Sequence, residues 1–520
     1  MIPVIFALTI IILTALFPHW IAAGRRAPLP PGPRRRPFIG NLPDFPRSRP
    51  WETFWKWCNE YGDAIFIDLP FKPIIVLGSA KAAMELLDGK SHIYSDRPYS
   101  TMMDMLSWGW GVSVLPYGSQ WRTYRRYFHD HFNHSVMPRY HAIELQNTRI
   151  LLTKILLRPE STREHIRCLP GFSIIQAAYG TQDDRATAEY VALADRALLS
   201  AREAIVPGAF IAELVPLLKY IPAWLPGGSA QRFAEKHKYD VIEMRDKPFA
   251  DVQAVVAAGR AIPSVAYNLM AQMQEENQGL DLSEEQVRTA RDVAGIAYAG
   301  AADTTTASAE SFVLAMAMFP EAQQKAQAEL DAVVGPSRLP DFNDLPELVY
   351  LRAVVLELLR WMPTVPLGLP HFIKQEDRYR GHRIPRGSIV IANVWAMLRN
   401  SEDYPEPEKF KPERFIGDDG KIDPSVPDPI SIAFGFGRRV CPGMDFALSL
   451  LSIYAASMLH VFEMKAGVEE TGQPLVLTAA TTDDGFSHPL TFPRHVQPRS
   501  SPQAEQLVRE IMFEQEHISL

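Results

Sequence analysis

The distribution of apolar and polar residues separates an apolar N-terminal segment from a long body whose pattern is mainly typical of helices. No charged side chain occurs before Arg25, and the apolar stretch from Ile2 to Ala23 approaches the ~20 residues that a helix needs to cross a bilayer. Further along, short runs rich in apolar and β-branched residues predict strands, at 65–69, 74–77 and 388–391. We therefore expect a mainly α fold with a minor β component.

The longest predicted helix begins after Ser283. Ser283 and Gln286 have the spacing of a capping box, in which each side chain satisfies a backbone N–H group at the start of the helix. The helix is predicted to run to about Met318, because Pro320 then starts a new pattern.

No internal repeat, low-complexity block or break in composition lies between Trp51 and Arg494. The sequence therefore predicts one folded domain and not several. We divide the chain into a membrane anchor at 1–24, a hinge rich in proline and arginine at 25–50, the folded domain at 51–495 and a C-terminal tail at 496–520.

The N-terminal segment has two interpretations. Arg25 and Arg26 directly follow the apolar run, and by the positive-inside rule such charges hold that end in the cytosol. The alternative is a cleaved signal peptide, because Ala22, Ala23 and Gly24 are small, but no basic residue precedes the apolar run. We favour an uncleaved single-pass anchor, with the arginines of the hinge beside the lipid head groups of the membrane.

Charge and cysteine content exclude several classes of protein. The net charge is −7, yet residues 1–50 carry seven arginines against the single Asp44, so the rest of the chain is acidic. An acidic body does not suit nucleic-acid binding, and we expect no nucleic-acid partner. The three cysteines, Cys58, Cys168 and Cys441, are too far apart for a zinc or paired-disulfide pattern, which indicates a reducing compartment.

The strongest local signal is the decapeptide from Phe434 to Gly443. Its glycines let the backbone come close to a bound group. Pro442 suits the first position of a helix, which predicts Cys441 at the N-cap, where backbone N–H groups and the helix dipole favour a thiolate and hence a metal ligand. Considered alone, the same residues also fit an inert buried thiol, or a dinucleotide loop without its third glycine.

A second segment combines small and polar residues on the longest predicted helix. Residues 293–302 are almost all small, which leaves room for a flat group beside the helix, and Asp303 and Thr304 follow directly. The Thr304 hydroxyl is placed to donate to the Gly300 carbonyl and to open the helix locally. The alternative interpretation is close helix packing with a polar edge.

Together these residues resemble the motifs of the cytochrome P-450 family. The family's haem-binding loop, FxxGxRxCxG, is matched at its fixed positions by Phe434, Gly437, Arg439, Cys441 and Gly443. The resemblance implies the P-450 fold, with a long central helix over the haem, the cysteine loop on the opposite face and small sheets at one side. It also implies haem b as the cofactor and Cys441 as the axial ligand of its iron.

The resemblance extends to other residues around the cofactor. Asp303 and Thr304 resemble the proton-delivery pair on the central helix, although Ala301 stands where glycine is usual. The implied propionate contacts are Trp121, Arg125, Arg439 and His371, and for His371 a histidine without a functional role is an equal alternative. The implied structural cluster is Glu357, Arg360 and Arg414.

The activity implied by the resemblance is a monooxygenase that inserts one O2-derived oxygen atom into an apolar small molecule, such as a terpenoid, polyketide or indole-type metabolite. NADPH would supply electrons through a separate NADPH-cytochrome P-450 reductase, with cytochrome b5 as a further donor, because the chain has no segment typical of flavin, iron–sulfur or nicotinamide binding. The residues expected to line the substrate cavity include Ala299, Val365 and Phe486.

The segments 222–227 and 484–489 are similar to fungal microsomal members of specialised metabolism. That similarity implies an endoplasmic reticulum membrane protein whose catalytic domain faces the cytosol. Two rival functions remain: within the same fold, a haem-thiolate isomerase or dehydratase that needs no reductase, and from a different class, a haem-binding sensor or membrane scaffold without catalysis. The pair Asp303 and Thr304 argues against the first rival, and turnover that persists without NADPH would support it.

Overall fold

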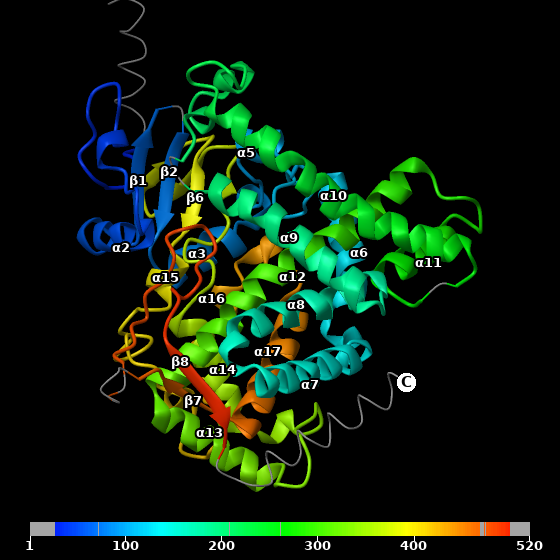
Figure 1. Cartoon of the computed structure of the whole chain (residues 1–520). Coiled ribbons are helices and arrows are strands. Elements are labelled where there is room, and N and C mark those ends of the chain that lie inside the picture. The colour runs from blue at the N-terminus through cyan, green and yellow to red at the C-terminus, as the bar shows by residue number, and fades with distance from the viewer. Residues whose placement is uncertain are drawn as a thin grey trace, which may run out of the picture.

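The computed structural model describes residues 27–70, 72–206, 209–260, 262–468, 473 and 475–499. The predicted anchor at 1–24 and all but the start of the predicted tail lie outside these residues. Helices form most of the described chain, and the sheets lie along one side of it (Figure 1). The longer helices are α2 (Pro50–Tyr61), α6 (Ser119–Phe132), α7 (His141–Leu157), α8 (Thr162–Tyr179), α9 (Asp184–Ala204), α10 (Ser229–Ala257), α11 (Val265–Glu276), α12 (Glu284–Met318), α13 (Pro320–Val333), α14 (Val349–Trp361) and α17 (Met444–Val461).

The main sheet has the strand order β1-β2-β6-β3. β2 pairs with β1 in the antiparallel sense and with β6 in the parallel sense, so that Ile74 lies opposite both Ile67 and Ile389. The three predicted strands are confirmed, and with them the mainly α class with a minor β component. The strands are β1 (Ala64–Leu69), β2 (Lys72–Leu77), β3 (His371–Phe372), β4 (Asp377–Tyr379), β5 (His382–Ile384), β6 (Ile389–Ala392), β7 (Phe462–Ala466) and β8 (Arg494–Pro498).

The predicted capping box is present at the start of α12. The Ser283 hydroxyl accepts from the Gln286 backbone, and the Gln286 side chain accepts from the Ser283 backbone. The helix then runs without interruption to Met318, as predicted. α8 packs along α12 more extensively than any other described element does, and α9, α10, α11 and α17 also contact α12. α12 is therefore the central helix of the fold.

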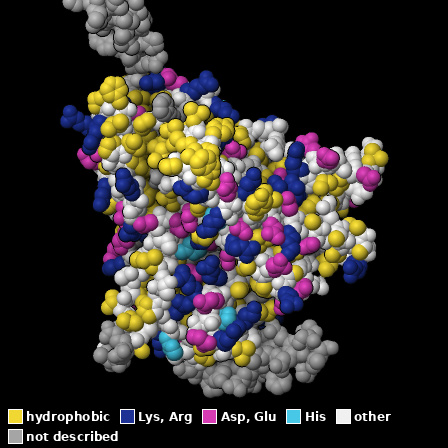
Figure 2. Space-filling model, turned by 45° about the horizontal axis from the view of Figure 1, so that its top comes forward, with side chains coloured by type: hydrophobic (Ala, Val, Ile, Leu, Met, Phe, Trp, Pro, Cys, Tyr) yellow, Lys and Arg dark blue, Asp and Glu magenta, His cyan; other side chains and the backbone are white. Residues whose placement is uncertain are grey.

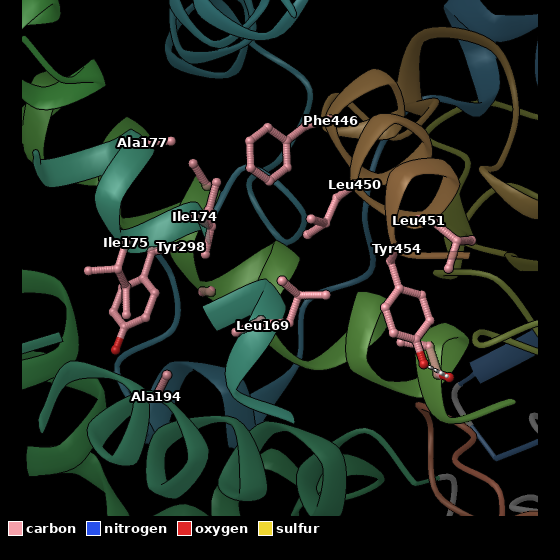
Figure 3. Close-up of a cluster of buried hydrophobic side chains, with 14 of the residues drawn as sticks. Leu169, Ile174, Ile175, Ala177, Ala194, Tyr298, Phe446, Leu450, Leu451 and Tyr454 are labelled. Atoms are coloured by element: carbon pink, nitrogen blue, oxygen red, sulfur yellow. Dashed lines mark hydrogen bonds between the residues drawn. The ribbon is translucent and has the colours of Figure 1, made fainter. Parts of the chain in front are cut away.

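A hydrophobic core joins α8, α12 and α17 (Figure 3). Ile174 of α8, Tyr298 of α12 and Leu450 of α17 are buried in it, and the Tyr454 hydroxyl donates to the Ala309 carbonyl at 3.0 Å. Within the described residues, α17 is the one helix long and apolar enough to cross a membrane, but most of it lies inside the protein. α17 thus has the burial of a core helix.

Two predicted boundaries fall inside packed structure. In the hinge predicted at 25–50, the Pro31 carbonyl accepts from the Phe66 backbone of β1, and the Pro28 carbonyl accepts from the Arg383 backbone of β5. At the other end, β8 pairs with β7 on both sides of the boundary between 495 and 496, where the predicted tail begins. The folded body therefore includes part of each flanking segment.

Candidate active site

Cys441 lies in the loop that leads into α17. Its backbone N–H donates to the Phe434 carbonyl at 2.8 Å, which folds the loop back on itself. The helix begins at Met444 with Gly443 as its N-cap residue, so the predicted N-cap position of Cys441 is wrong by two residues. The reason is local: Pro442 and Gly443 form a turn, and the Gly443 carbonyl accepts from the Ala447 backbone at the start of the helix.

The surroundings of Cys441 act on its thiol in opposite directions. Burial raises the pKa of Cys441, whereas the backbone N–H of Gly443 and the charge of Arg125 lower it, and the net direction is upward. The chain alone therefore does not hold this sulfur as a thiolate, and a bound cation such as a metal ion would have to stabilise it.

The two glycines of the haem-loop motif have different surroundings. Gly437 has φ +56°, and a Cβ atom there would lie 2.3 Å from the Leu87 carbonyl oxygen in the helical turn at Met84–Asp88. Gly437 thus allows the cysteine loop to pack closely against the backbone of the Met84–Asp88 turn. A Cβ at Gly443 would meet no heavy atom within 4 Å, which leaves that side of the loop open.

Arg439 is buried in the same loop and bonds to the backbone of the 95–115 region. Its Nε, Nη1 and Nη2 atoms donate to the carbonyls of Ser95, Val112 and Leu115 at 2.7, 3.0 and 2.8 Å. The guanidinium also lies 4.6 Å from the ring centroid of Trp121 on α6. One N–H group on each Nη atom remains to bind another acceptor.

Arg97 is a second buried cation beside Arg439. Its Nε donates to the Ser113 carbonyl at 3.0 Å, and Nη1 donates to the carbonyls of Leu369 and Pro370, both at 2.7 Å. Burial and the charge of Arg439 lower the pKa of Arg97 to about 9, so it remains charged at neutral pH. The sequence did not single out Arg97, because a lone arginine in an irregular segment carries no periodic or spacing signal.

Arg125 completes a group of three arginines near the cysteine. It is partly buried on α6, and its charge acts on both Cys441 and Arg439. Within the described residues no protein group accepts a hydrogen bond from its guanidinium. Asp96 is the carboxylate whose charge reaches Arg97 and Arg439. We call Arg97, Arg125 and Arg439 the arginine triad.

His371 lies beside the arginine triad but is neutral. Its Nδ1 lies 2.7 Å from the Tyr94 carbonyl, an acceptor, so Nδ1 carries the proton and Nε2 presents a lone pair. Burial and the charges of Arg97 and Arg439 lower the pKa of His371 to about 3. His371 Nε2 therefore has no proton to donate at neutral pH. It could donate to a carboxylate only if the negative charge of that carboxylate raised the pKa of His371.

The middle of α12 presents an open face. Although it lies on the central helix, Gly300 is exposed, and a Cβ atom there would meet nothing within 4 Å. The Thr304 hydroxyl donates to the Gly300 carbonyl at 2.8 Å, as predicted, without breaking the helix. Ala299, one position earlier, is buried. The open face at Gly300 and the Thr304 hydroxyl thus lie about one helical turn apart.

Asp303 faces two basic side chains from other parts of the chain. Its Oδ1 lies 3.3 Å from His488 Nε2 and 3.5 Å from Arg202 Nη1. Burial by itself raises the pKa of Asp303, but His488, Arg202 and Arg167 outweigh it, and the net pKa is lowered. The sequence did not reveal Arg202 or His488 as partners, because they lie about 100 and 185 residues away along the chain.

Val365 and Phe486 lie on two segments that are bonded to each other. The Ser487 backbone donates to the Thr364 carbonyl at 2.7 Å, and the Thr364 hydroxyl lies 3.1 Å from the Ser308 hydroxyl of α12. Val365 and Phe486 are partly buried, each next to one of these bonded residues. Both segments are therefore held against the half of α12 that follows Asp303.

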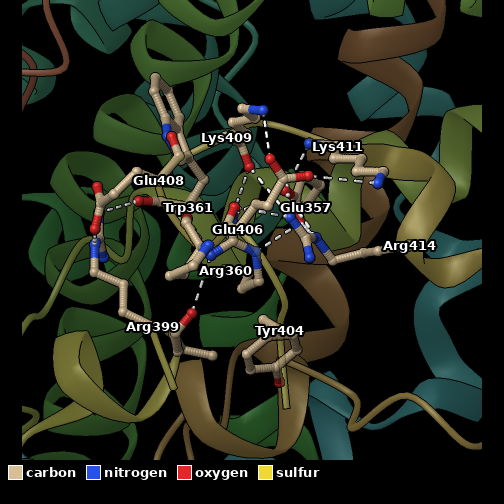
Figure 4. Close-up of polar contacts among 12 residues, drawn as sticks. Glu357, Arg360, Trp361, Arg399, Tyr404, Glu406, Glu408, Lys409, Lys411 and Arg414 are labelled. Carbon is tan, nitrogen blue, oxygen red and sulfur yellow. Dashed lines mark hydrogen bonds and ion pairs between the residues drawn. The ribbon is translucent and has the colours of Figure 1, made fainter. Parts of the chain in front are cut away.

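Glu357, Arg360 and Arg414 meet in one cluster of polar contacts (Figure 4). Arg360 Nε and Nη2 donate to the two carboxylate oxygens of Glu357 at 2.7 and 2.8 Å, and Arg414 Nε lies 3.1 Å from the same carboxylate. The Lys411 backbone donates to Glu357 at 2.7 Å. Every remaining N–H of Arg360 donates to a backbone carbonyl, at Leu398, Pro407 or Lys409.

A family model described as cytochrome P450 matches residues 30–482. The chain belongs to the cytochrome P450 family. Its relatives include cytochrome P450 monooxygenase ple1 of Rhodocybe pseudopiperita, 39% identical over 94% of both chains. Cytochrome P450 monooxygenase COX1 of Coprinopsis cinerea is 36% identical over 92% of both chains. Tryptamine 4-monooxygenase of Psilocybe cyanescens is 35% identical over 92% of this chain and 94% of its own.

The family resemblance and the P450 fold expected from the sequence are thus confirmed. As a P450 of fungal monooxygenase type, the chain is an oxidoreductase, and membership implies haem and a redox partner. The residues present fit such a group. An open loop beside Cys441, an open face at Gly300 and the arginine triad together suit a flat molecule that carries a metal ion and carboxylates.

Proposed function

We propose that this P450 inserts one O2-derived oxygen atom into an apolar small molecule, with Cys441 as the iron ligand. The observation that carries the proposal is the arginine triad next to Cys441. Arg125 has no protein acceptor within the described residues, and because its guanidinium is partly buried, an anion beside it would pair with a charge that water solvates only in part. The two propionates of haem b would supply the missing anions.

The protein would hold haem through several kinds of contact. Cys441 would bind the iron, with the Gly443 backbone N–H directed at its sulfur, and Arg125 and Arg439 would bind propionates while Trp121 packs against Arg439. Phe434 would fix the cysteine loop through its carbonyl. When bound, haem supplies the activation of O2, and donation from a thiolate ligand favours cleavage of the O–O bond.

Asp303 and Thr304 would move protons to the open face of α12. The Thr304 hydroxyl is tethered to the Gly300 carbonyl, which fixes its position beside that face. Asp303 has one buried carboxylate oxygen, Oδ2, without a partner in the described chain. That oxygen would take a proton from water and pass it on towards Thr304, as a positioned general acid.

We propose NADPH-cytochrome P-450 reductase as the electron donor, with cytochrome b5 as a further donor. Exposed arginines lie on the outer side of the cysteine loop and of α6, where Arg438 and Arg122 lie 5.3 and 5.8 Å from the Tyr117 ring centroid. A basic surface at this position favours an acidic partner and is sensitive to salt.

We place the protein in the endoplasmic reticulum membrane, with one anchor and a cytosolic domain. Large apolar side chains are exposed at the end of the molecule that holds the turn between β1 and β2 (Figure 2). Asn41 bonds to Asp68 at that end, and Glu213 pairs with Lys72 there. Such a patch suits contact with lipid. Its members are Phe38, Ile39, Leu42, Ile211, Val215, Leu217, Tyr220 and Trp224.

The ligand assignment is tested by the spectrum of the reduced, CO-bound protein. We expect the red-shifted Soret band of a thiolate ligand in the wild type and in Cys168→Ser, and its loss in Cys441→Ser. A band that is not shifted in the wild type, or is unchanged in Cys441→Ser, would contradict the proposal.

The reaction is tested with reductase, NADPH and a panel of one sesquiterpene hydrocarbon, one aromatic polyketide and tryptamine. Tryptamine is included because one relative is named for acting on it. We expect a product heavier by one oxygen atom, derived from O2 and formed only with NADPH. Turnover without NADPH would support the isomerase alternative, and haem binding without any NADPH oxidation would support a non-catalytic protein.

A further inference from the structure

The carboxylate of Asp303 faces both of its basic neighbours with one of its two oxygens. Arg202, in the last turn of α9, and His488, in the segment before β8, both lie at ion-pair distance from Oδ1. Oδ2 is buried and has no hydrogen-bond partner in the described chain, and His488 Nε2 meets Oδ1 at 3.3 Å without hydrogen-bond geometry. The two oxygens of the acid therefore have different environments, and two elements outside α12 create the difference.

The segment that carries His488 is fixed on both sides of the imidazole. The His488 backbone N–H donates to the Thr482 hydroxyl at 3.1 Å, and the Ser487 backbone donates to the Thr364 carbonyl at 2.7 Å. Just beyond it, Arg163 of α8 donates to the Pro489 carbonyl at 3.3 Å and pairs with Glu310 of α12. The position of His488 is thus set by the fold and does not depend on Asp303.

The same segment also carries Phe486, two residues before His488. Because Phe486 is a proposed substrate contact, a shift of this segment would move the substrate surface and the partner of Asp303 together. Burial is nearly complete at His488 and Asp303, so bulk water does not compete for this contact.

We propose that His488 is a positioning residue that holds Oδ1 of Asp303 and leaves Oδ2 as the oxygen that exchanges protons. This proposal rests on the proposed function, in which Asp303 delivers protons. It assigns the choice of oxygen to a side chain outside α12 and not to α12 itself.

The charges around this pair come from two packed helices, α8 and α9. Arg202 of α9 shares the carboxylate, and Arg167 of α8 and Asp195 of α9 act on it from farther away. Without the imidazole of His488, Arg202 alone faces Oδ1, and the carboxylate gains freedom to rotate. Loss of the imidazole also removes one of the contacts that lower the pKa of Asp303.

Two substitutions test the role of His488. His488→Gln keeps an N–H donor but carries no charge, whereas His488→Leu removes the donor as well. His495→Gln is the matched control, because His495 is exposed in β8 and pairs only locally, with Gln497. All variants are compared as the full-length, haem-loaded protein with reductase and NADPH, without added substrate.

We expect His488→Leu to slow NADPH oxidation by about threefold or more, with a larger solvent deuterium isotope effect, because proton transfer by a misplaced acid becomes limiting. His488→Gln restores most of the rate, because its amide N–H can still donate to Oδ1. His495→Gln behaves as the wild type. An unchanged rate and isotope effect in His488→Leu would overturn the proposal.

A second measurement does not depend on catalysis. The thermal midpoints of His488→Gln, Asp303→Asn and the double variant form a double-mutant cycle. We expect the two changes to be non-additive, because each of them removes the same contact. Additive midpoints would overturn the proposal even if His488→Leu does not fold.

The outcomes also separate this proposal from the proposed function. If Asp303→Asn slows NADPH oxidation and the His488 variants do not, the function stands and the positioning role fails. If the wild type oxidises no NADPH, or Asp303→Asn has no effect on the rate, the proposed proton delivery fails, and the thermal cycle still reports whether the two side chains are coupled.

Discussion

The protein contains two groups of buried or partly buried charged side chains, and they differ in whether the chain satisfies their hydrogen-bond donors. In the Glu357 group, the carboxylate and the backbone carbonyls of the 398–409 region accept from every N–H of Arg360. In the arginine triad, Arg125 has no acceptor in the described chain, and Arg439 has N–H groups to spare.

The comparison of the Glu357 group with the arginine triad shows how a structural cluster differs from a binding site when both contain arginines that are at least partly buried. A cluster whose donors are all satisfied contributes to the fold and has nothing left to offer a ligand. A cluster with unsatisfied donors is unfavourable until an anion arrives, and the free energy of unfolding then depends on that ligand. The predictions below test this difference, beginning with the largest expected effect.

Glu357→Gln should be the most destabilising of these changes. Arg360 is fully buried and Arg414 nearly so, and the substitution leaves both without a carboxylate, a change that typically costs about 3 to 5 kcal/mol. Denaturant unfolding of the haem-loaded protein measures it. Glu406→Gln, which breaks an exposed pair with Lys409, is the control and should change the free energy of unfolding by under about 1 kcal/mol. Equal effects of the two variants would contradict the distinction.

Arg125→Gln should have the opposite effect: it should change the stability of the apoprotein little and weaken haem binding strongly. Loss of a hydrogen bond to a charged group costs about 1.5 to 3 kcal/mol, which corresponds to roughly 10- to 100-fold weaker haem binding. Transfer of haem to an acceptor protein measures the affinity. Arg122→Gln, an exposed neighbour on α6, should leave haem affinity unchanged. Loss of apoprotein stability in Arg125→Gln without loss of haem affinity would contradict a propionate role.

The sequence predicted those parts of the fold that depend on local pattern. The capping box at Ser283 and the end of α12 before Pro320 were predicted correctly, because caps and breakers act within a few residues. The position of Cys441 relative to α17 was not, because the bond from its backbone to Phe434 is a property of the whole loop.

Site residues that belong to a sequence motif could be predicted, whereas residues that reach the site only through tertiary packing could not. The run of small residues before Asp303 and Thr304 singled out this pair, the family resemblance implied its role, and the four-residue spacing predicted the bond from Thr304 to Gly300. Arg97 and His488 reach the site from irregular segments, and Arg202 reaches it from the end of α9. No periodicity links them to the residues they meet, so only the fold reveals them.

Glu144 extends the comparison to a buried acid without a cation. It is fully buried on α7 and accepts from Ser449 at 2.5 Å, and burial raises its pKa to about 8. The unfolded chain ionises near pH 4.5, the ordinary value, whereas the folded protein does not until about pH 8. Folding stability attributable to this group is therefore lost progressively as the pH rises between these values.

Glu144→Gln should accordingly stabilise the protein more at pH 8 than at pH 5, by an amount on the order of 1 to 3 kcal/mol once the unsatisfied amide is allowed for. Thermal midpoints across this range measure the difference. Glu160→Gln, an exposed change near the end of the same helix, should show no such trend. A gain independent of pH would indicate that Glu144 is neutral for another reason or is ionised throughout.

Lys374→Gln should have the smallest effect, although Lys374 pairs with the carboxylate nearest the arginine triad. Lys374 is 64% exposed, and exposed pairs contribute under about 1 kcal/mol. In this variant Asp96 still accepts hydrogen bonds from the backbone N–H groups of Arg97 and Tyr117, at 2.9 and 2.8 Å. The carboxylate therefore keeps its position and its charge beside the arginine triad. Both the free energy of unfolding and the haem affinity should therefore stay near those of the wild type. A marked loss of haem in Lys374→Gln would mean that the anion is attracted by the summed charge of this region and not by the unsatisfied donors of Arg125.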